Sequence, residues 1–143
     1  MEQAPADTLH VVAGVLEQAG AVLVCQRKLT ARHGGKWEFP GGKVEPDETG
    51  GEALRRELSE ELGIETTTGP LLWVSRHRYA HHRPLEVAFF LVPTWTGTIT
   101  NRVFEAVSWR RVAALPALDF LDADREFVAR LARGSIRIPE GRR

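Results

Sequence analysis

Residues 42–64 read GKVEPDETGGEALRRELSEELGI, a polar loop that leads into the most regular helical pattern of the chain. Apolar residues at every fourth position predict an amphipathic helix over residues 51–62, with a stripe formed by Leu54, Leu58 and Leu62. Gly63 follows at the position where a left-handed residue commonly ends a helix. The leucine stripe is expected to bury itself against a sheet.

Three acidic side chains lie on one flank of this predicted helix. At about 100° per residue, Glu57, Glu60 and Glu61 share an arc of about 100° beside the leucine stripe. Ala53 lies beneath them and leaves room above it. We call Glu57, Glu60 and Glu61 the glutamate trio, and we expect it to face a groove at the edge of the core.

Like charges at this spacing repel each other, so the glutamate trio needs a compensating charge. Arg56 is placed to form ion pairs on the helix surface with Glu60 and Glu52. Carboxylate oxygens of this kind fit a hard divalent cation, Mg²⁺ or Mn²⁺. Zinc is not favoured, because His81 and His82 are adjacent and would point to opposite faces of a strand.

The segments on both sides of the helix read as strands. Five apolar or β-branched runs predict strands at residues 9–16, 21–26, 71–78, 85–95 and 107–109. The first two are expected to form a hairpin, and the fourth is apolar enough to be covered on both faces. A second helix is predicted at residues 122–133. This order predicts an α/β or α+β class, with a mixed sheet between helical layers.

Length and composition fit one domain. The chain has 143 residues, of which 43% are hydrophobic and 27% charged, so we expect a single domain over residues 1–143 with loosely held tails at 1–7 and 134–143. Its net charge is zero, but residues 43–63 carry −4, which suits a cation-binding site. The single Cys25 predicts a buried, reduced thiol. Without a signal peptide or an apolar run of ~20 residues, we expect a cytoplasmic protein.

The same stretch matches a known signature. Gly42, Glu48 and the run RELSEELGI at residues 56–64 are spaced as in the Nudix box, at every defined position over 23 residues. The segment WEFPGGKVE at residues 37–45 resembles the MutT branch, the nucleoside triphosphate pyrophosphohydrolases. The resemblance covers residues 8–133. It implies an α/β/α sandwich with a mixed sheet, and a metal-dependent hydrolase of a nucleoside diphosphate linked to another group.

The resemblance also implies roles by position. The glutamate trio and the carbonyl oxygen of Gly41 would bind Mg²⁺ or Mn²⁺, while Arg56 would orient the carboxylates. Glu48 would be a structural or auxiliary acid of the motif, alongside Gly42. Glu105, just before the last predicted strand, is the candidate for a further metal ligand or for the base that activates water.

Four other positions correspond to the nucleotide site of MutT-like enzymes. Arg27 would contact a substrate phosphate, and Glu38 and Phe39 would line the nucleoside pocket. Asp124 stands where MutT has an asparagine that reads an oxidised purine. An ionised carboxylate would accept a hydrogen bond from the amino group of cytosine and a protonated one could also donate, so 8-oxo-dGTP and cytidine nucleotides both stay open. Asp122 and Asp124 could equally cap the second helix.

The implied reaction releases a nucleoside monophosphate and pyrophosphate, with catalysis supplied chiefly by positioning and charge neutralisation. The base, the sugar, the attacked phosphorus, the number of metal ions and the biological role stay open. Other nucleoside-diphosphate-linked substrates are an alternative, and so are RNA 5′ ends, because the loop RHRYAHHR at residues 76–83 is cationic. A non-catalytic nucleotide-binding module is less favoured, because all the carboxylates are present. A monomer and a homodimer both fit, and no membrane partner is expected.

Overall fold

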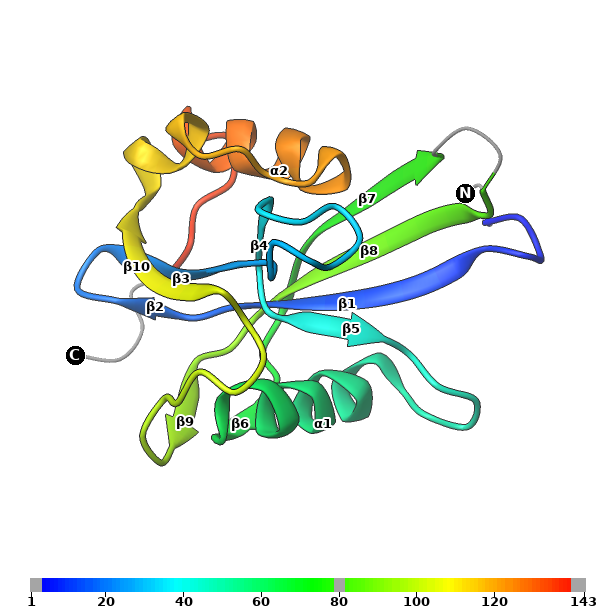
Figure 1. Ribbon diagram of the computed structural model, residues 1–143, viewed down its shortest axis with the longest axis horizontal. Helices are drawn as coiled ribbons and strands as arrows, with labels where there is room; N and C mark the ends of the chain where they lie inside the picture. The colour runs from blue at the N-terminus through cyan, green and yellow to red at the C-terminus, as the bar shows by residue number, and fades with distance from the viewer. Residues whose placement is uncertain (1–3, 79–81, 140–143) are drawn as a thin grey trace.

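The computed structural model describes residues 4–78 and 82–139, arranged as strands between two helices (Figure 1). The first three residues of the loop predicted at 79–84, and the ends of both predicted tails, lie outside the described residues. The strands are β1 (Leu9–Val15), β2 (Glu17–Gln18), β3 (Ala21–Gln26), β4 (Trp37–Glu38), β5 (Gly41–Lys43), β6 (Glu65–Thr67), β7 (Leu71–Arg78), β8 (Pro84–Leu91), β9 (Thr94–Thr96) and β10 (Ala106–Arg111). The helices are α1 (Gly50–Leu62), the 3-10 helix η1 (Val112–Ala117) and α2 (Asp122–Ala132).

The strands form a mixed arrangement. One sheet has the order β5-β1-β8-β7, in which β1 and β8 are parallel and the other pairs antiparallel. A second sheet has the order β10-β3-β2, with β4 also paired to β3, and β6 pairs with β9 in a separate ribbon. The predicted fold class, with mixed strands between helical layers, is therefore confirmed.

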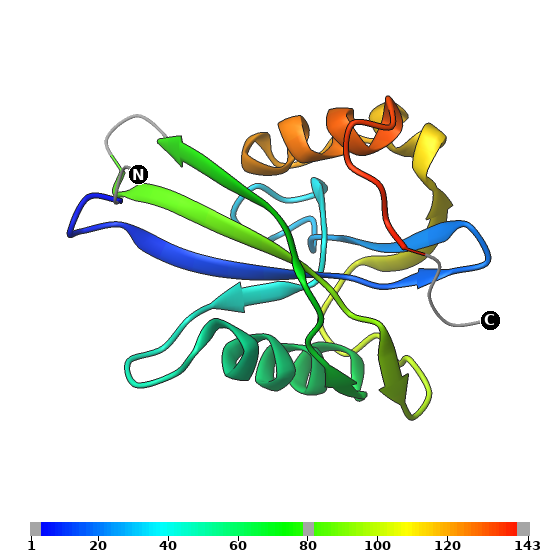
Figure 2. The ribbon, with the colours of Figure 1, turned by 180° about the vertical axis from the view of Figure 1, so that it is seen from behind.

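The two helices cover opposite faces of the strands, as both views show (Figures 1 and 2). Leu54, Leu58 and Leu62 of α1 are fully buried in an apolar cluster on one side, as the leucine stripe predicted. Phe127 and Leu131 of α2 belong to a second cluster on the other side. The strands therefore separate two apolar cores, one packed against each helix.

Local capping fixes both ends of α1. The Thr49 hydroxyl accepts a hydrogen bond from the Glu52 amide at 3.1 Å, and the Glu52 carboxylate accepts one from the Thr49 amide at 2.8 Å. This reciprocal capping box satisfies amide groups that the first turn leaves without partners. Gly63 ends the helix with φ 69°, as predicted.

Three strand predictions are wrong in part. The predicted hairpin pairs only through β2, because the chain leaves the first sheet after Val15 and enters the second at Glu17. The strand predicted at residues 85–95 is two strands in different sheets, and Pro93, which has no amide hydrogen to donate, lies between them. The strand predicted at 107–109 is longer, since all of β10 pairs with β3.

Cys25 and the tails complete the fold. Cys25 is fully buried in β3, and burial raises the pKa of its thiol, which agrees with a structural thiol. Beyond α2, Ile136 and Ile138 pack against the core on the α2 side. No helix in the described part of the chain is both long enough and apolar enough to cross a membrane.

Candidate active site

The glutamate trio lies on the flank of α1 that borders the buried face, as its spacing predicted. The side chains differ in exposure: Glu57 is 18% exposed and Glu60 is 60% exposed. Glu61 is partly buried and accepts a hydrogen bond from the Gly41 amide at 3.0 Å. One turn of helix therefore presents carboxylates to both the interior and the surface.

Within the glutamate trio, Glu61 lies in the place that is least favourable for a negative charge. Burial, together with the nearby carboxylates of Glu57 and Glu38, raises its pKa to about 9, while the Gly41 amide opposes the shift. The Glu57 pKa is also raised, chiefly by burial, although Arg56 acts against it. Without a cation, this end of the site favours a protonated Glu61 at neutral pH.

Arg56 holds the acidic groups together. Its Nε donates to Glu48 at 2.7 Å, and its Nη1 donates to Glu57 at 2.9 Å and to Glu60 at 3.4 Å. The hydrogen bonds from Arg56 lower the pKa of Glu48 to about 2. The guanidinium fork can serve several carboxylates at once, which a lysine could not do in the same geometry.

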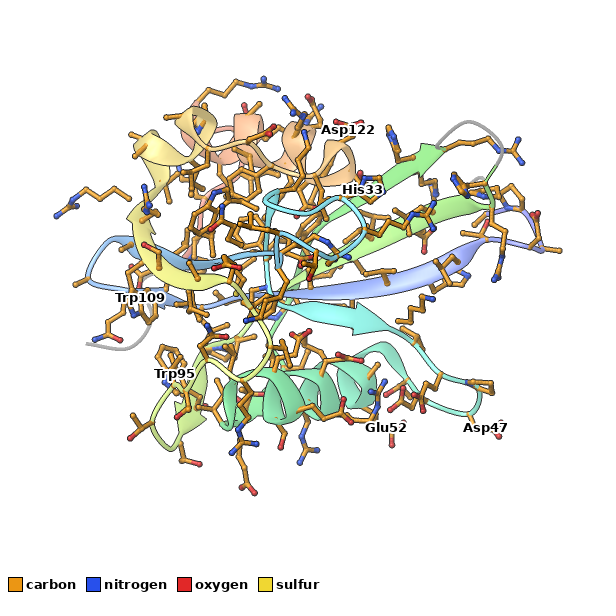
Figure 3. The ribbon with its side chains drawn as sticks, viewed as in Figure 1. His33, Asp47, Glu52, Trp95, Trp109 and Asp122 are labelled. Carbon is orange, nitrogen blue, oxygen red and sulfur yellow. The ribbon has the colours of Figure 1, made fainter. Side chains whose placement is uncertain are left out.

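One predicted partner of Arg56 is wrong. Glu52 does not pair with Arg56, because its carboxylate is used in the capping box with Thr49. Figure 3 shows Glu52 near the N-terminal end of α1, with Asp47 in the loop before it. Helical spacing alone placed Glu52 within reach, but Glu48 from the preceding loop takes its place on Arg56.

The donor set fits a hard divalent cation. Its side-chain donors are carboxylate oxygens, which Mg²⁺ and Mn²⁺ prefer. Glycine at position 42 lets a member of the trio approach the backbone, since a β-carbon there would lie 2.5 Å from Cδ of Glu57. Within residues 4–78 and 82–139, no three acidic, histidine or cysteine side chains converge into a preformed site. Glu57 and Glu60 are instead held by Arg56.

A cavity of about 260 Å³ opens beside this helix flank. Six residues predicted for metal or nucleotide binding line it: Arg27, Glu38, Phe39, Gly41, Glu61 and Asp124. They come from the end of β3, from β4 and β5, and from both helices. Segments that lie far apart in the sequence therefore meet around one cavity, whose lining includes both acidic and basic residues.

Arg27 is already oriented in this cavity. Its Nε donates to the Arg32 carbonyl oxygen at 2.8 Å, and its Nη1 lies 3.3 Å from Glu38. Burial raises the pKa of Glu38, and the Arg27 charge partly offsets this shift. Arg27 therefore holds its guanidinium on the cavity wall through a backbone contact and a carboxylate.

Asp124 is the most buried acid of the cavity, at 5% exposure. Its Oδ2 accepts a hydrogen bond from the Phe39 amide at 3.4 Å. Burial, followed by the charge of Glu38, raises its pKa to about 8. The capping alternative is wrong for both aspartates, because α2 has no side-chain capping bond and Asp122 pairs with Arg125 at 3.2 Å.

Phe39 lines the cavity and is also part of the core, while its place in a nucleoside pocket stays a prediction. Its ring is 3% exposed and packs against three other phenylalanines, with centroid distances of 5.4 to 5.9 Å to Phe89, Phe120 and Phe127. The ring thus builds the cavity floor into the α2-side core, while its backbone amide meets Asp124. This packing limits how far the floor can shift.

Glu105 lies apart from the cavity lining. Its side chain is exposed, and its amide donates to the Gln26 carbonyl oxygen at 2.9 Å, next to Arg27. Lys43, which the sequence reasoning missed, does line the cavity. Its place directly after Gly41 and Gly42 could have revealed it, because all three residues of β5 line the cavity.

A family model, several characterised proteins and several solved structures all match this chain. Residues 8–131 match the model of the NUDIX domain. The CTP pyrophosphohydrolase of Escherichia coli (strain K12) is 42% identical over 101 residues, covering 71% of this chain and 74% of that protein. The 8-oxo-dGTP diphosphatase of Proteus vulgaris is 43% identical over 95 residues, covering 66% and 84%. The solution structure of the E. coli ORF135 protein superposes with a TM-score of 0.78 at 34% identity, covering 86% and 87%.

Proposed function

Because this chain belongs to the NUDIX domain family, as a MutT-like hydrolase of nucleoside triphosphates, we propose that it cleaves its substrate to a nucleoside monophosphate and pyrophosphate in the cavity beside α1. One observation carries the proposal. The same cavity is lined by the acidic Glu61, by Arg27 and by the buried Asp124. This arrangement suits a molecule with a polyphosphate at one end and a base at the other.

Divalent metal dependence is typical of the family, and we assign the ligands to the glutamate trio and the Gly41 carbonyl oxygen. We favour Mg²⁺, with Mn²⁺ as a substitute, because both accept oxygen donors. A divalent ion held there would neutralise phosphate oxygens and lower the pKa of a bound water. Arg56 and Glu48 would keep the carboxylates oriented through the hydrogen bonds described above.

Two side chains are assigned to the phosphates and to the water. Arg27 would bind a phosphate oxygen, since it is the arginine that lines the cavity among the residues that the structure describes. Glu105 would supply a further ligand or accept the proton of the attacking water. Its position supports this assignment only indirectly, through the hydrogen bond that joins its backbone to the strand end before Arg27.

Asp124 would read the base. With its pKa near neutrality, the side chain is available both as a carboxylate and as a carboxylic acid. The ionised form accepts a hydrogen bond from an amino group, such as N4 of cytosine, whereas the protonated form also donates. Cytidine triphosphates and oxidised guanine triphosphates are therefore the two substrate classes that we propose. They match the activities for which the two relatives are named, CTP pyrophosphohydrolase and 8-oxo-dGTP diphosphatase.

A substrate screen tests this function. The purified chain would be incubated with CTP, dCTP, 5-methyl-dCTP, 8-oxo-dGTP and dGTP, in Mg²⁺ and then in Mn²⁺, and both products would be quantified. We expect monophosphate and pyrophosphate in equal amounts, with at least one cytidine or oxidised guanine substrate preferred over dGTP. A lack of hydrolysis with every nucleotide and both metals would contradict the proposal and favour a non-catalytic binding module.

RNA 5′ ends are the second candidate substrate, on the basis of the cationic segment from Arg76 to Arg83. Its centre lies outside the described residues, and Arg76 is already paired with Glu86 at 3.0 Å. Comparing pyrophosphate release from triphosphate-capped RNA and from free nucleotides separates the two candidates. Light scattering during the same experiments would distinguish a monomer from a homodimer.

A further inference from the structure

The C-terminal turn of α1 carries two members of the glutamate trio and no basic residue of its own. The last carbonyl groups of any helix have no partners within that helix, and they give this end a partial negative charge. In this turn the carbonyl oxygen of Ser59 accepts a hydrogen bond from the Gly63 amide at 3.0 Å, whereas those of Glu61 and Leu62 depend on donors from outside the helix. How they are satisfied determines how firmly the two carboxylates are held.

A distant loop satisfies them. The Thr100 amide donates to the Leu62 carbonyl oxygen at 2.8 Å, and the Arg102 amide donates to that of Glu61 at 3.1 Å. The Arg102 side chain adds a hydrogen bond from Nη1 to the Ser59 carbonyl oxygen at 3.3 Å. The loop at residues 99–105 thus caps the turn with two backbone donors and one cation.

Arg102 reaches this position across a glycine. A β-carbon on Gly63 would lie 2.9 Å from Nη2 of Arg102 and 3.0 Å from its Cζ, so the guanidinium lies directly over the glycine. Gly63 also has φ 69°, in the left-handed region where other residues are strained. The glycine of the motif therefore serves both the helix end and the docking of Arg102.

The loop itself is anchored at its other end. The Asn101 side chain accepts from the Phe104 amide at 2.8 Å and donates to the Phe104 carbonyl oxygen at 2.8 Å. Phe104 is 6% exposed and packs in the core on the α1 side. Glu105 follows and is bonded through its backbone to Gln26. The loop consequently links the last turn of α1 to the segment that carries Glu105.

We propose that Arg102 is a positioning residue for metal binding, which fixes the last turn of α1 and so the carboxylates of Glu60 and Glu61. The inference rests on the proposed function, because it concerns the metal ligands assigned there. Arg102 does not touch the substrate. It acts through the helix end, where its charge complements the partial charge of the carbonyls and its guanidinium holds the loop in place.

The direction in which the Mn²⁺ affinity changes when Arg102 is replaced separates a positioning role from a purely electrostatic one. Removing a positive charge near the trio would by itself strengthen cation binding, whereas loosening the turn weakens it. We therefore expect Arg102→Ala to bind Mn²⁺ about three- to tenfold more weakly in calorimetry, which corresponds to the loss of one hydrogen bond. The matched control is Arg55→Ala, which removes an arginine from α1, the helix that carries the trio. Arg55 is exposed and makes no side-chain hydrogen bond or ion pair within the part of the chain that the structure describes.

Amide hydrogen exchange in the metal-free protein gives a second readout. The Thr100 and Gly63 amides should exchange faster in Arg102→Ala than in the wild type, and at the wild-type rate in Arg55→Ala. Arg102→Gln repeats the test should the alanine variant not fold. Unchanged or stronger Mn²⁺ binding, together with unchanged exchange, would overturn the inference. If the wild type itself took up no Mn²⁺, the proposed function would fail, while exchange would still test whether Arg102 holds the loop.

Discussion

The carboxyl group of Glu57 packs directly over the α-carbon of Gly42, so closely that a β-carbon on Gly42 would lie 2.5 Å from Cδ and 2.7 Å from both carboxylate oxygens. Gly42 belongs to β5 and Glu57 to α1, and the contact sets how near the helix flank comes to the strand. The glycine therefore fixes the position of a proposed metal ligand. A larger residue would force Glu57 away from its present place.

The first prediction follows from this contact. Gly42→Ala should lower turnover by about 10²-fold, because a displacement of about 1 Å in a positioned group has this cost. The measurement is steady-state hydrolysis, with circular dichroism to check the fold. Gly51→Ala is the control, since the nearest atom to a β-carbon there is 3.6 Å away. That change should leave turnover intact and raise stability by up to about 1 kcal/mol. Equal turnover in Gly42→Ala and the wild type would contradict the idea.

The second prediction concerns the trio itself. Glu57→Gln and Glu61→Gln should each lower turnover by at least ~10²-fold, because each removes a charged metal ligand or a proton acceptor while keeping the shape of the side chain. Thermal unfolding should show that both variants fold. Glu65→Gln, at an exposed position on β6, is the control and should keep the wild-type rate. Near-normal turnover in both trio variants would refute the assignment of the metal site.

The third prediction is a pH dependence of cation binding. The Glu61 pKa of about 9 means that Glu61 carries a proton at neutral pH in the metal-free protein. A cation can bind this carboxylate only after the proton leaves, so the apparent affinity for Mg²⁺ or Mn²⁺ should rise about tenfold per pH unit below pH 9. Calorimetry in two buffers of different ionisation enthalpy should detect release of one proton. Affinity that does not change between pH 6 and pH 8 would contradict the assignment.

The fourth prediction concerns Asp124. Since its pKa in the fold, about 8, lies above the usual value of 3.8, ionising it costs stability. Its stabilising contribution is complete below about pH 4 and is lost as the pH rises to about 8. Asp124→Asn cannot ionise. As the pH rises from about 4 to about 8, the melting temperature of the variant should therefore increase relative to that of the wild type.

The same substitution should change base selectivity. An amide presents a fixed donor and a fixed acceptor at every pH, whereas the ionised carboxylate accepts only, so above about pH 8 the kcat/KM for cytidine triphosphates should fall relative to that for 8-oxo-dGTP. Ser75→Ala is the control for packing near Asp124, because Ser75 lies outside the cavity lining while its hydroxyl donates to the carbonyl oxygen of Ala123, which lines the cavity. An unchanged ratio in Asp124→Asn would mean that Asp124 does not read the base.

The sequence of residues 42–64 determined α1 almost completely. Its leucine stripe, its flank of glutamates and its terminal glycine all follow from helical geometry, which acts between residues a few positions apart. The resemblance carried by the same residues also pointed to Arg27 and Asp124, although local patterns at those two positions are not distinctive. The expected fold class and helix ends were confirmed for the same reason, because caps and stripes are local features.

Only the tertiary structure decided how these groups meet. Glu61 and Asp124 both acquire their raised pKa values chiefly from burial, with a further contribution from the charge of Glu38. Arg56 takes Glu48 instead of Glu52, and Arg102 reaches the helix end from a loop some forty residues away. Spacing along a chain specifies which side chains share a face. Desolvation, long-range pairing and strand exchange between sheets depend on which faces the whole fold presses together, so they arise only once it has formed.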